Sequence, residues 1–140
     1  MNRQELHQFV FEFIAARKYG VISTIGPGGE PQSALVGIAV SPQLEIVFDT
    51  VKTSRKYPNL KAAPRIAVVI GWEGEQTVQY EGVAVEPEDG ALLRAKAVYF
   101  GAWPSGVERQ QWPGIAYFLI RPTWLRYSDF DTGRVEEMRF

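Results

Sequence analysis

The sequence predicts a mainly β protein, an antiparallel barrel of six or seven strands with two or three helices. Short β-branched runs recur along the chain, tight turns separate most of them, and few stretches have helical periodicity. Neighbouring strands joined by short turns pair in antiparallel fashion, whereas a parallel sheet needs a long crossover between successive strands. We expect one domain over residues 1–140, because no linker or repeat interrupts the pattern.

The N-terminal segment is predicted to be a helix that ends near Lys18. Its apolar residues recur at three- and four-residue spacing, which places them on one face. Asn2 followed by Glu5 resembles a weak capping box, with asparagine in place of serine or threonine. Gly20 provides a C-terminal stop. The single histidine, His7, neighbours the apolar face and is expected at a partly exposed surface position.

After Gly20 the hydrophobic period changes from helical to strand-like. Strands are expected at 21–25, 31–40, 44–50, 65–72, 76–87, 115–122 and 124–129, with an edge piece at 135–140. Helices are expected over Pro58–Ala63 and Glu88–Phe100. The second of these should bury Leu92, Leu93, Ala97 and Phe100. Residues 101–114 are expected to form a loop.

Composition excludes several classes of protein. Fifteen basic and sixteen acidic residues give a net charge of -1, so no overall field favours nucleic acid or an anionic membrane. The chain contains no cysteine and one histidine, which excludes disulfides, thiolate chemistry and a multi-histidine metal site. No run approaches the ~18 apolar residues of a membrane span, and no signal peptide is evident. We therefore expect a soluble cytoplasmic protein.

A local cluster of positive charge follows the strand at 44–50. It comprises Lys52, Thr53, Ser54, Arg55 and Lys56. Hydroxyls donate single hydrogen bonds to a phosphate, and an arginine offers a two-pronged fork. The N-terminus of the following helix adds free N–H groups and a positive dipole end. The residues alone predict an anion site, with a solvated basic loop as the alternative.

The order of residues around this cluster resembles the flavin-phosphate region of the pyridoxamine 5′-phosphate oxidase-like split-barrel family. The matching elements are Val47-Phe48-Asp49-Thr50, Ser54-Arg55-Lys56 and Pro64-Arg65-Ile66. Residues 30–40 also resemble the second strand of the family, and residues 80–86 resemble its glycine-containing strand. The match covers residues 19–86 well and the C-terminal third loosely.

The resemblance implies a homodimer that binds FMN in the groove between two split barrels. By position, Ser54, Arg55 and Lys56 would hold the phosphate, Asp49 and Thr50 would approach the ribityl chain or ring edge, and Ala34, Leu35 and Val36 would line the isoalloxazine. Thr77 and Phe118 occupy the positions where the family places a ring-contacting glutamine and tryptophan. Because the flavin carries the redox chemistry, no side chain is assigned a catalytic role.

The substrate positions depart from those of true pyridoxamine phosphate oxidases. Those enzymes use a lysine on the second strand and an Arg-x-His element near the C-terminus, where this chain has Ala39 and Trp124-Leu125-Arg126. The resemblance therefore implies a related FMN-dependent oxidoreductase with a different small-molecule substrate or electron donor. The alternatives are a reductase that uses the deazaflavin F420 and a non-catalytic flavin-binding or storage protein. The family also has haem-handling relatives, but no motif in this sequence supports haem binding.

The remaining candidate residues have simpler interpretations. Aromatic side chains beside a barrel most often belong to a core or an interface, and paired acidic residues in turns and tails are most often solvated. Arg109, in a tryptophan-rich loop, is expected to face water. The aromatic residues in question are Trp103, Trp112, Trp124 and Tyr127, and the acidic pairs are Glu73 with Glu75 and Glu136 with Glu137.

Overall fold

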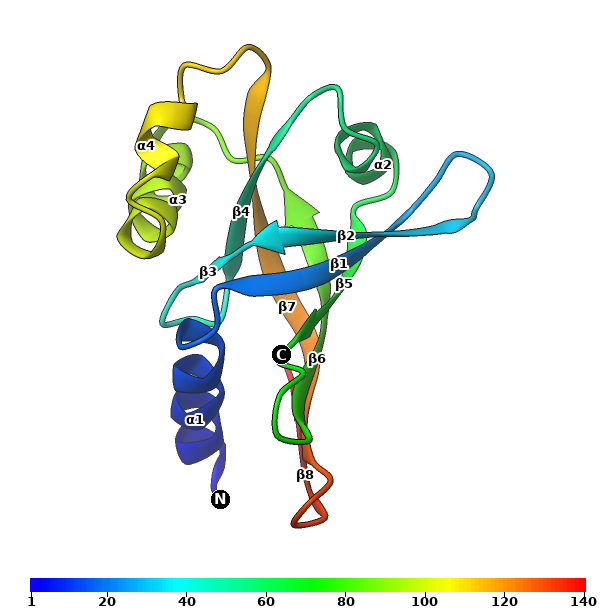
Figure 1. The fold of residues 1–140 in the computed structure, drawn as a ribbon, viewed down its shortest axis with the longest axis vertical. Helices are drawn as coiled ribbons and strands as arrows, with labels where there is room; N and C mark the ends of the chain where they lie inside the picture. Colours follow the sequence, from blue (N-terminus) through cyan, green and yellow to red (C-terminus); the bar gives the residue numbers. More distant parts are fainter.

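The computed structural model describes residues 1–140 and contains eight strands and four helices (Figure 1). In chain order the elements are α1 (Arg3–Ala15), β1 (Tyr19–Ile25), β2 (Pro31–Gly37), β3 (Ala39–Val40), β4 (Ile46–Val51), α2 (Lys56–Ala62), β5 (Arg65–Ile70), β6 (Gln76–Val85), α3 (Asp89–Ala102), α4 (Gly106–Arg109), β7 (Ile115–Asp129) and β8 (Arg134–Arg139). None of the helices is long and apolar enough to cross a membrane.

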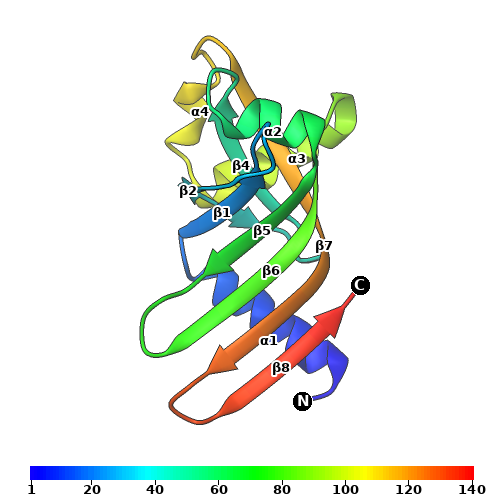
Figure 2. The ribbon, with the colours of Figure 1, turned by 90° about the vertical axis from the view of Figure 1, so that its right-hand side faces the viewer.

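All eight strands belong to one antiparallel sheet, in which seven follow the order β2-β1-β5-β6-β7-β4-β3 and β8 pairs with β7. β7 has fifteen residues and is the longest strand. It pairs with β6 along one edge, and with β4 and then β8 along the other. The sheet curls into a half-barrel, so the prediction of a mainly β antiparallel split barrel is confirmed (Figure 2). The structure has one strand and one helix more than the highest numbers expected.

Helix α1 packs on the inner side of the sheet and begins as predicted. The Asn2 side chain accepts a hydrogen bond from the Glu5 amide at 2.9 Å, and the Glu5 carboxylate accepts one from the Asn2 amide. The apolar face of α1 enters the main core, where Phe13 meets the ring of Tyr127 edge-on. Figure 2 shows α1 crossing the sheet at the end formed by β7 and β8. α1 ends at Ala15, three residues before the predicted end at Lys18.

A second, smaller core lies between α3 and the outer side of the sheet. Its buried members are Ala39, Val47, Ala95, Tyr99 and Tyr117. The predicted buried face of α3 is wrong in two of its four members, because the side chain of Leu93 is 70% exposed and Ala97 is also exposed. The helix packs through Ala95 and Tyr99, four residues apart, which rotates its contact face away from the leucine pair.

Two predicted strand boundaries differ from the structure. The strand expected at 31–40 is two strands, because the chain bends at Ile38 and leaves the β1 edge to pair with β4. The strands expected at 115–122 and 124–129 are the single strand β7. Pro122 does not interrupt β7, because the register with β6 shifts between Glu81 and Gly82. The shift is a β-bulge, a position at which a sheet tolerates proline.

The loop expected at 101–114 contains the one-turn helix α4 at Gly106–Arg109. Helix α2 starts at Lys56, two residues earlier than predicted, which leaves Pro58 in its first turn, where no intrahelical bond to its nitrogen is needed. The edge piece expected at 135–140 is present as β8. His7 is half-buried, in agreement with the partly exposed position expected, and its ring nitrogen lies 2.7 Å from the carbonyl oxygen of Pro42.

The hydroxyl of Tyr80, on β6, connects that strand to β7 and to the turn between β3 and β4 at the centre of the core. It donates to the carbonyl of Leu44 at 2.8 Å and lies 3.2 Å from that of Ile120. Tyr80→Phe is expected to lower the free energy of unfolding by about 1–2 kcal/mol, because a buried carbonyl loses its donor. Urea denaturation at pH 7 measures this effect. A variant as stable as the wild type would show that these hydrogen bonds contribute little.

The same hydroxyl makes stability sensitive to alkali. Burial, with a smaller contribution from Glu45, raises the pKa of Tyr80 far above its usual value. The unfolded chain releases this proton near pH ~10, whereas the folded chain retains it. Stability is therefore complete below that pH and falls as the pH rises above it. Denaturation at pH 8 and at about pH 10.5 should show a smaller loss in Tyr80→Phe than in the wild type.

Candidate functional site

A cavity of about 390 Å³ lies between β2, β4, the start of α2 and the segment that joins α3 to β7. Three groups of side chains line it. The hydroxyl–lysine group consists of Thr50, Ser54 and Lys56, and the Asp49 network consists of Asp49, Tyr99 and Arg109. The apolar wall consists of Tyr19, Leu35, Val36, Trp103, Trp112 and Ile115.

The hydroxyl–lysine group forms where β4 ends. Thr50 is the penultimate residue of β4, and a turn closed by the Ser54 amide on the Val51 carbonyl brings Ser54 back toward it. Their hydroxyl oxygens lie 2.9 Å apart. Lys56 forms no ion pair, and burial lowers its pKa while the charge of Asp49 opposes that effect. The group thus offers two hydroxyls and an unpaired ammonium to an anion.

The Asp49 network joins β4 to α3 and α4. One Asp49 oxygen accepts a hydrogen bond from the Tyr99 hydroxyl at 3.1 Å, and the other accepts one from Arg109 Nε at 2.9 Å. Arg109 Nη2 also donates to the Tyr99 hydroxyl at 3.0 Å. The bond to Asp49 raises the pKa of Arg109, and burial followed by the Asp49 charge raises the pKa of Tyr99. Both oxygens of the carboxylate are therefore occupied.

The apolar wall is held in place from two sides. Trp103 donates its indole N–H to the carbonyl of Ile38 at 2.9 Å and meets the ring of Tyr19 edge-on at 5.3 Å between centroids. A Cβ added at Gly37 would lie 2.8 Å from the Trp103 ring, so the indole packs directly on backbone. The Arg109 guanidinium carbon lies 6.0 Å from the centre of the Trp112 ring, which makes the Asp49 network border this wall.

The structure brings six of the ten predicted flavin-site residues to this cavity. They are Leu35, Val36, Asp49, Thr50, Ser54 and Lys56. The other four lie outside it within one chain. Arg55 is exposed at the N-cap of α2, and Ala34 packs against the main core. Thr77 lies at the start of β6, where its hydroxyl donates to the Ile70 carbonyl at 3.4 Å, and Phe118 is buried against Phe48.

The expectation that Arg109 faces water is wrong, because its guanidinium pairs with Asp49. The side chains of Arg109 and Asp49 are only 22% and 14% exposed. The pairing was not predictable from spacing, since sixty residues separate the two. Nothing in the sequence assigned Tyr99 to a site. Trp103 was a candidate to cap a pocket, although a core or interface position was favoured, and it does line this cavity.

The positions that hold substrate in true pyridoxamine phosphate oxidases are buried or paired with other residues in this chain. Ala39 is buried beneath α3 in the second core. Trp124 pairs with Arg139 across β7 and β8, away from the cavity. Arg126 donates from Nε to the Glu137 carboxylate at 2.8 Å. None of these residues lines the cavity.

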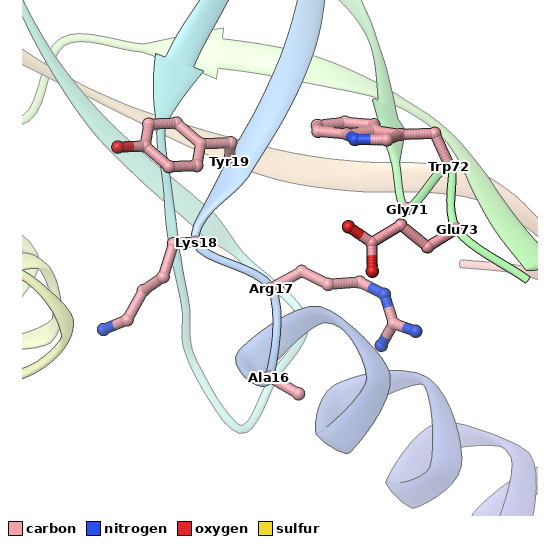
Figure 3. A pocket seen from close by; sticks show the side chains of 7 residues that line it. All are labelled: Ala16, Arg17, Lys18, Tyr19, Gly71, Trp72 and Glu73. Atoms are coloured by element: carbon pink, nitrogen blue, oxygen red, sulfur yellow. The ribbon is translucent and has the colours of Figure 1, made fainter.

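A smaller cavity of about 240 Å³ lies between the end of α1 and the β5–β6 turn (Figure 3). Arg17 points toward Glu73 across it, whereas Lys18 points away and donates to the Ala102 carbonyl at 2.5 Å. The Arg17 guanidinium also lies 3.4 Å above the Phe13 ring and donates to the Phe13 carbonyl. Tyr19 lines both cavities. No group of three or more histidine, aspartate or glutamate side chains lies close enough to share a metal ion.

The fold is a split barrel, and its cavity places two hydroxyls and a lysine ammonium beside an apolar wall. The family model for pyridoxamine 5′-phosphate oxidase matches residues 6–129. The chain therefore belongs to the pyridoxamine 5′-phosphate oxidase-like family. Comparison with curated protein sequences gives no significant match.

Solved structures of similar fold include three from different bacteria. A heme binding protein from Mycobacterium smegmatis has a TM-score of 0.81 at 21% identity, with 92% of this chain and 56% of that chain covered. General Stress Protein 26 from Bacillus anthracis str. Sterne has a TM-score of 0.76 at 22% identity, covering 97% and 99%. A putative pyridoxamine 5′-phosphate oxidase from Listeria innocua has a TM-score of 0.70 at 17% identity, covering 87% and 97%. This chain thus spans about half of the Mycobacterium smegmatis protein. At these identities the likeness concerns the fold.

Gly37→Ala tests the contact that positions the apolar wall. The added methyl group would push the pinned Trp103 ring, and we expect a loss of about 1–3 kcal/mol of stability and a shift in tryptophan fluorescence. Gly101→Ala is the control, because a Cβ there meets nothing within 4 Å. Equal stability of the two variants in urea denaturation would show that the indole moves freely.

Proposed function

We propose that the protein binds FMN in the cavity beside β4 and works as an FMN-dependent oxidoreductase on a substrate other than pyridoxamine phosphate. The observation that carries this proposal is the hydroxyl–lysine group, in which Thr50, Ser54 and the unpaired Lys56 converge. An anionic phosphate supplies the missing partner for the ammonium and acceptors for the hydroxyls. Membership of the family supports a flavin as the bearer of that phosphate.

The rest of the cavity suits the remainder of a flavin. Leu35 and Val36 offer apolar side chains to a flat ring, and Asp49 lines the same cavity next to the hydroxyl–lysine group. Arg55 reaches a phosphate only by reorienting its exposed side chain. The flavin would supply hydride and electron transfer, while these residues bind it and keep water from one face.

We also propose that two copies form the complete site. The outer face of β1, β2 and β5 carries the exposed apolar side chains of Leu35 and Val69, and the exposed Trp72 follows the end of β5. Val21 pairs with both Leu35 and Val69, so the apolar surface crosses three strands. A continuous apolar face of this kind is typical of an interface. Since Leu35 also lines the cavity, a partner on this face would border the flavin.

Purified protein distinguishes this proposal from its alternatives. We expect a yellow preparation that releases FMN on denaturation and is reduced by a nicotinamide or chemical donor. A colourless protein that binds F420 but not FMN would overturn it in favour of a deazaflavin reductase. Bound FMN that no donor and acceptor pair can cycle would favour a storage protein.

Lys56→Ala tests the phosphate assignment. Loss of one charge-assisted contact is expected to weaken FMN binding about tenfold to a hundredfold. Arg55→Ala should have a smaller effect because its side chain lies outside the cavity, and the double variant should bind most weakly. Lys61→Ala is the matched control on the same helix, since Lys61 pairs with Glu86. Flavin fluorescence titration gives the affinities, and equal affinities of Lys56→Ala and the control would remove the assignment.

Val69→Asp tests the dimer. A charge on the β5 side of the apolar face is expected to give monomers in analytical ultracentrifugation, with a matching loss of FMN affinity. Val135→Asp places the same charge on β8, outside that face, at a similarly exposed valine. A wild-type protein that is monomeric with full flavin affinity would contradict the proposal.

A further inference from the structure

The Asp49 network determines the charge that a substrate meets in the cavity. The cavity is lined by three formally charged side chains, Asp49, Lys56 and Arg109. In the proposed function, Lys56 is used by the flavin phosphate. Asp49 and Arg109 then remain, and they neutralise each other through the 2.9 Å hydrogen bond. The rest of the lining consists of aromatic and aliphatic side chains and the hydroxyls of Thr50, Ser54 and the tyrosines.

Further hydrogen bonds hold both charges of the Asp49–Arg109 pair against protein groups, so that neither is free to bind a ligand. The second oxygen of Asp49 accepts from Tyr99, and Arg109 also donates to that hydroxyl. Tyr99 is 1% exposed, so the pair is anchored on a buried side chain. Lys18, behind the wall, is engaged with the Ala102 carbonyl and lies 5.5 Å from the Trp103 ring. Among the side chains that line the cavity, a charged substrate therefore finds no free counter-charge, and it would lose its hydration without compensation.

We propose that the substrate bound against the flavin is an uncharged, flat, largely apolar molecule, and that the Asp49–Arg109 pair enforces this selectivity. The inference rests on the proposed function and specifies its substrate class. Trp112, Trp103 and Tyr19 supply faces and edges on which a flat ring packs. The pair acts by cancelling charge, so either partner left alone would attract ligands of the opposite sign.

Three probes that share one ring system test the selectivity. They are 2-naphthol, naphthalene-2-sulfonate and 2-naphthylmethylamine, which are neutral, anionic and cationic at pH 7. Isothermal titration calorimetry on the FMN-loaded protein gives the affinities without any turnover. In the wild type, 2-naphthol is expected to bind at least about tenfold more tightly than either charged probe, the ratio that one uncompensated charged hydrogen bond produces.

Two substitutions should change the selectivity in opposite directions. Asp49→Asn frees Arg109, so the sulfonate should gain about tenfold relative to 2-naphthol. Arg109→Gln leaves Asp49 unpaired, so the amine should gain by a similar factor. Asp131→Asn, in the exposed turn before β8, is the matched control and should leave all ratios unchanged. Circular dichroism and FMN content, measured on the same samples, report whether each variant is folded and loaded.

The outcomes separate the inference from the proposed function. Wild-type protein that binds no FMN would overturn both the proposed function and the inference. A loaded wild type that binds the sulfonate or the amine as tightly as 2-naphthol overturns the inference while the flavin assignment stands. Loaded variants that keep the wild-type ratios overturn the inference in the same way. If either variant fails to fold or load, the wild-type ratios and the other variant decide.

Discussion

The continuous hydrogen bonding of β7 is the constraint on which the rest of the molecule depends. This fifteen-residue strand pairs with β6 on one edge and with β4 and β8 on the other, so it joins all parts of the sheet. Its pairing with β4 sets Asp49 opposite Tyr117 and Phe48 opposite Phe118. Because side chains alternate along a strand, the same register sends the phenylalanines into the main core and Asp49 toward α3.

The candidate site is therefore assembled from two parts of the chain, one positioned by short-range contacts and the other by contacts between distant residues. β4 and the turn after it supply the hydroxyl–lysine group through short-range contacts, such as the one between Thr50 and Ser54. The segment after α3 supplies Trp103, Arg109 and Trp112 through contacts across the chain. The Asp49 network is the point at which the two parts meet, because Asp49 belongs to the first and Arg109 to the second.

The sequence predicted what local pattern controls. The capping box at Asn2, the position of most strands and the proximity of Thr50 and Ser54 all depend on neighbours within a few positions. The sequence did not predict the features that depend on contacts between distant parts of the chain. The bulge that carries Pro122 depends on β6, and the orientation of α3 depends on the small core around Tyr99. The ion pair between Arg109 and Asp49 depends on the fold and on the path of the segment between α3 and β7. No spacing of residues in the sequence predicts it.

The separation of the two parts has an evolutionary consequence. Between α3 and β7 the chain runs for a dozen residues without joining the sheet, and its side-chain bonds to the barrel pass through a few positions such as Trp103 and Arg109. Mutations, insertions and deletions in this segment can reshape the apolar wall while the barrel ladder and the residues around Ser54 stay the same. Divergence within one scaffold then needs changes in a single contiguous stretch of the gene.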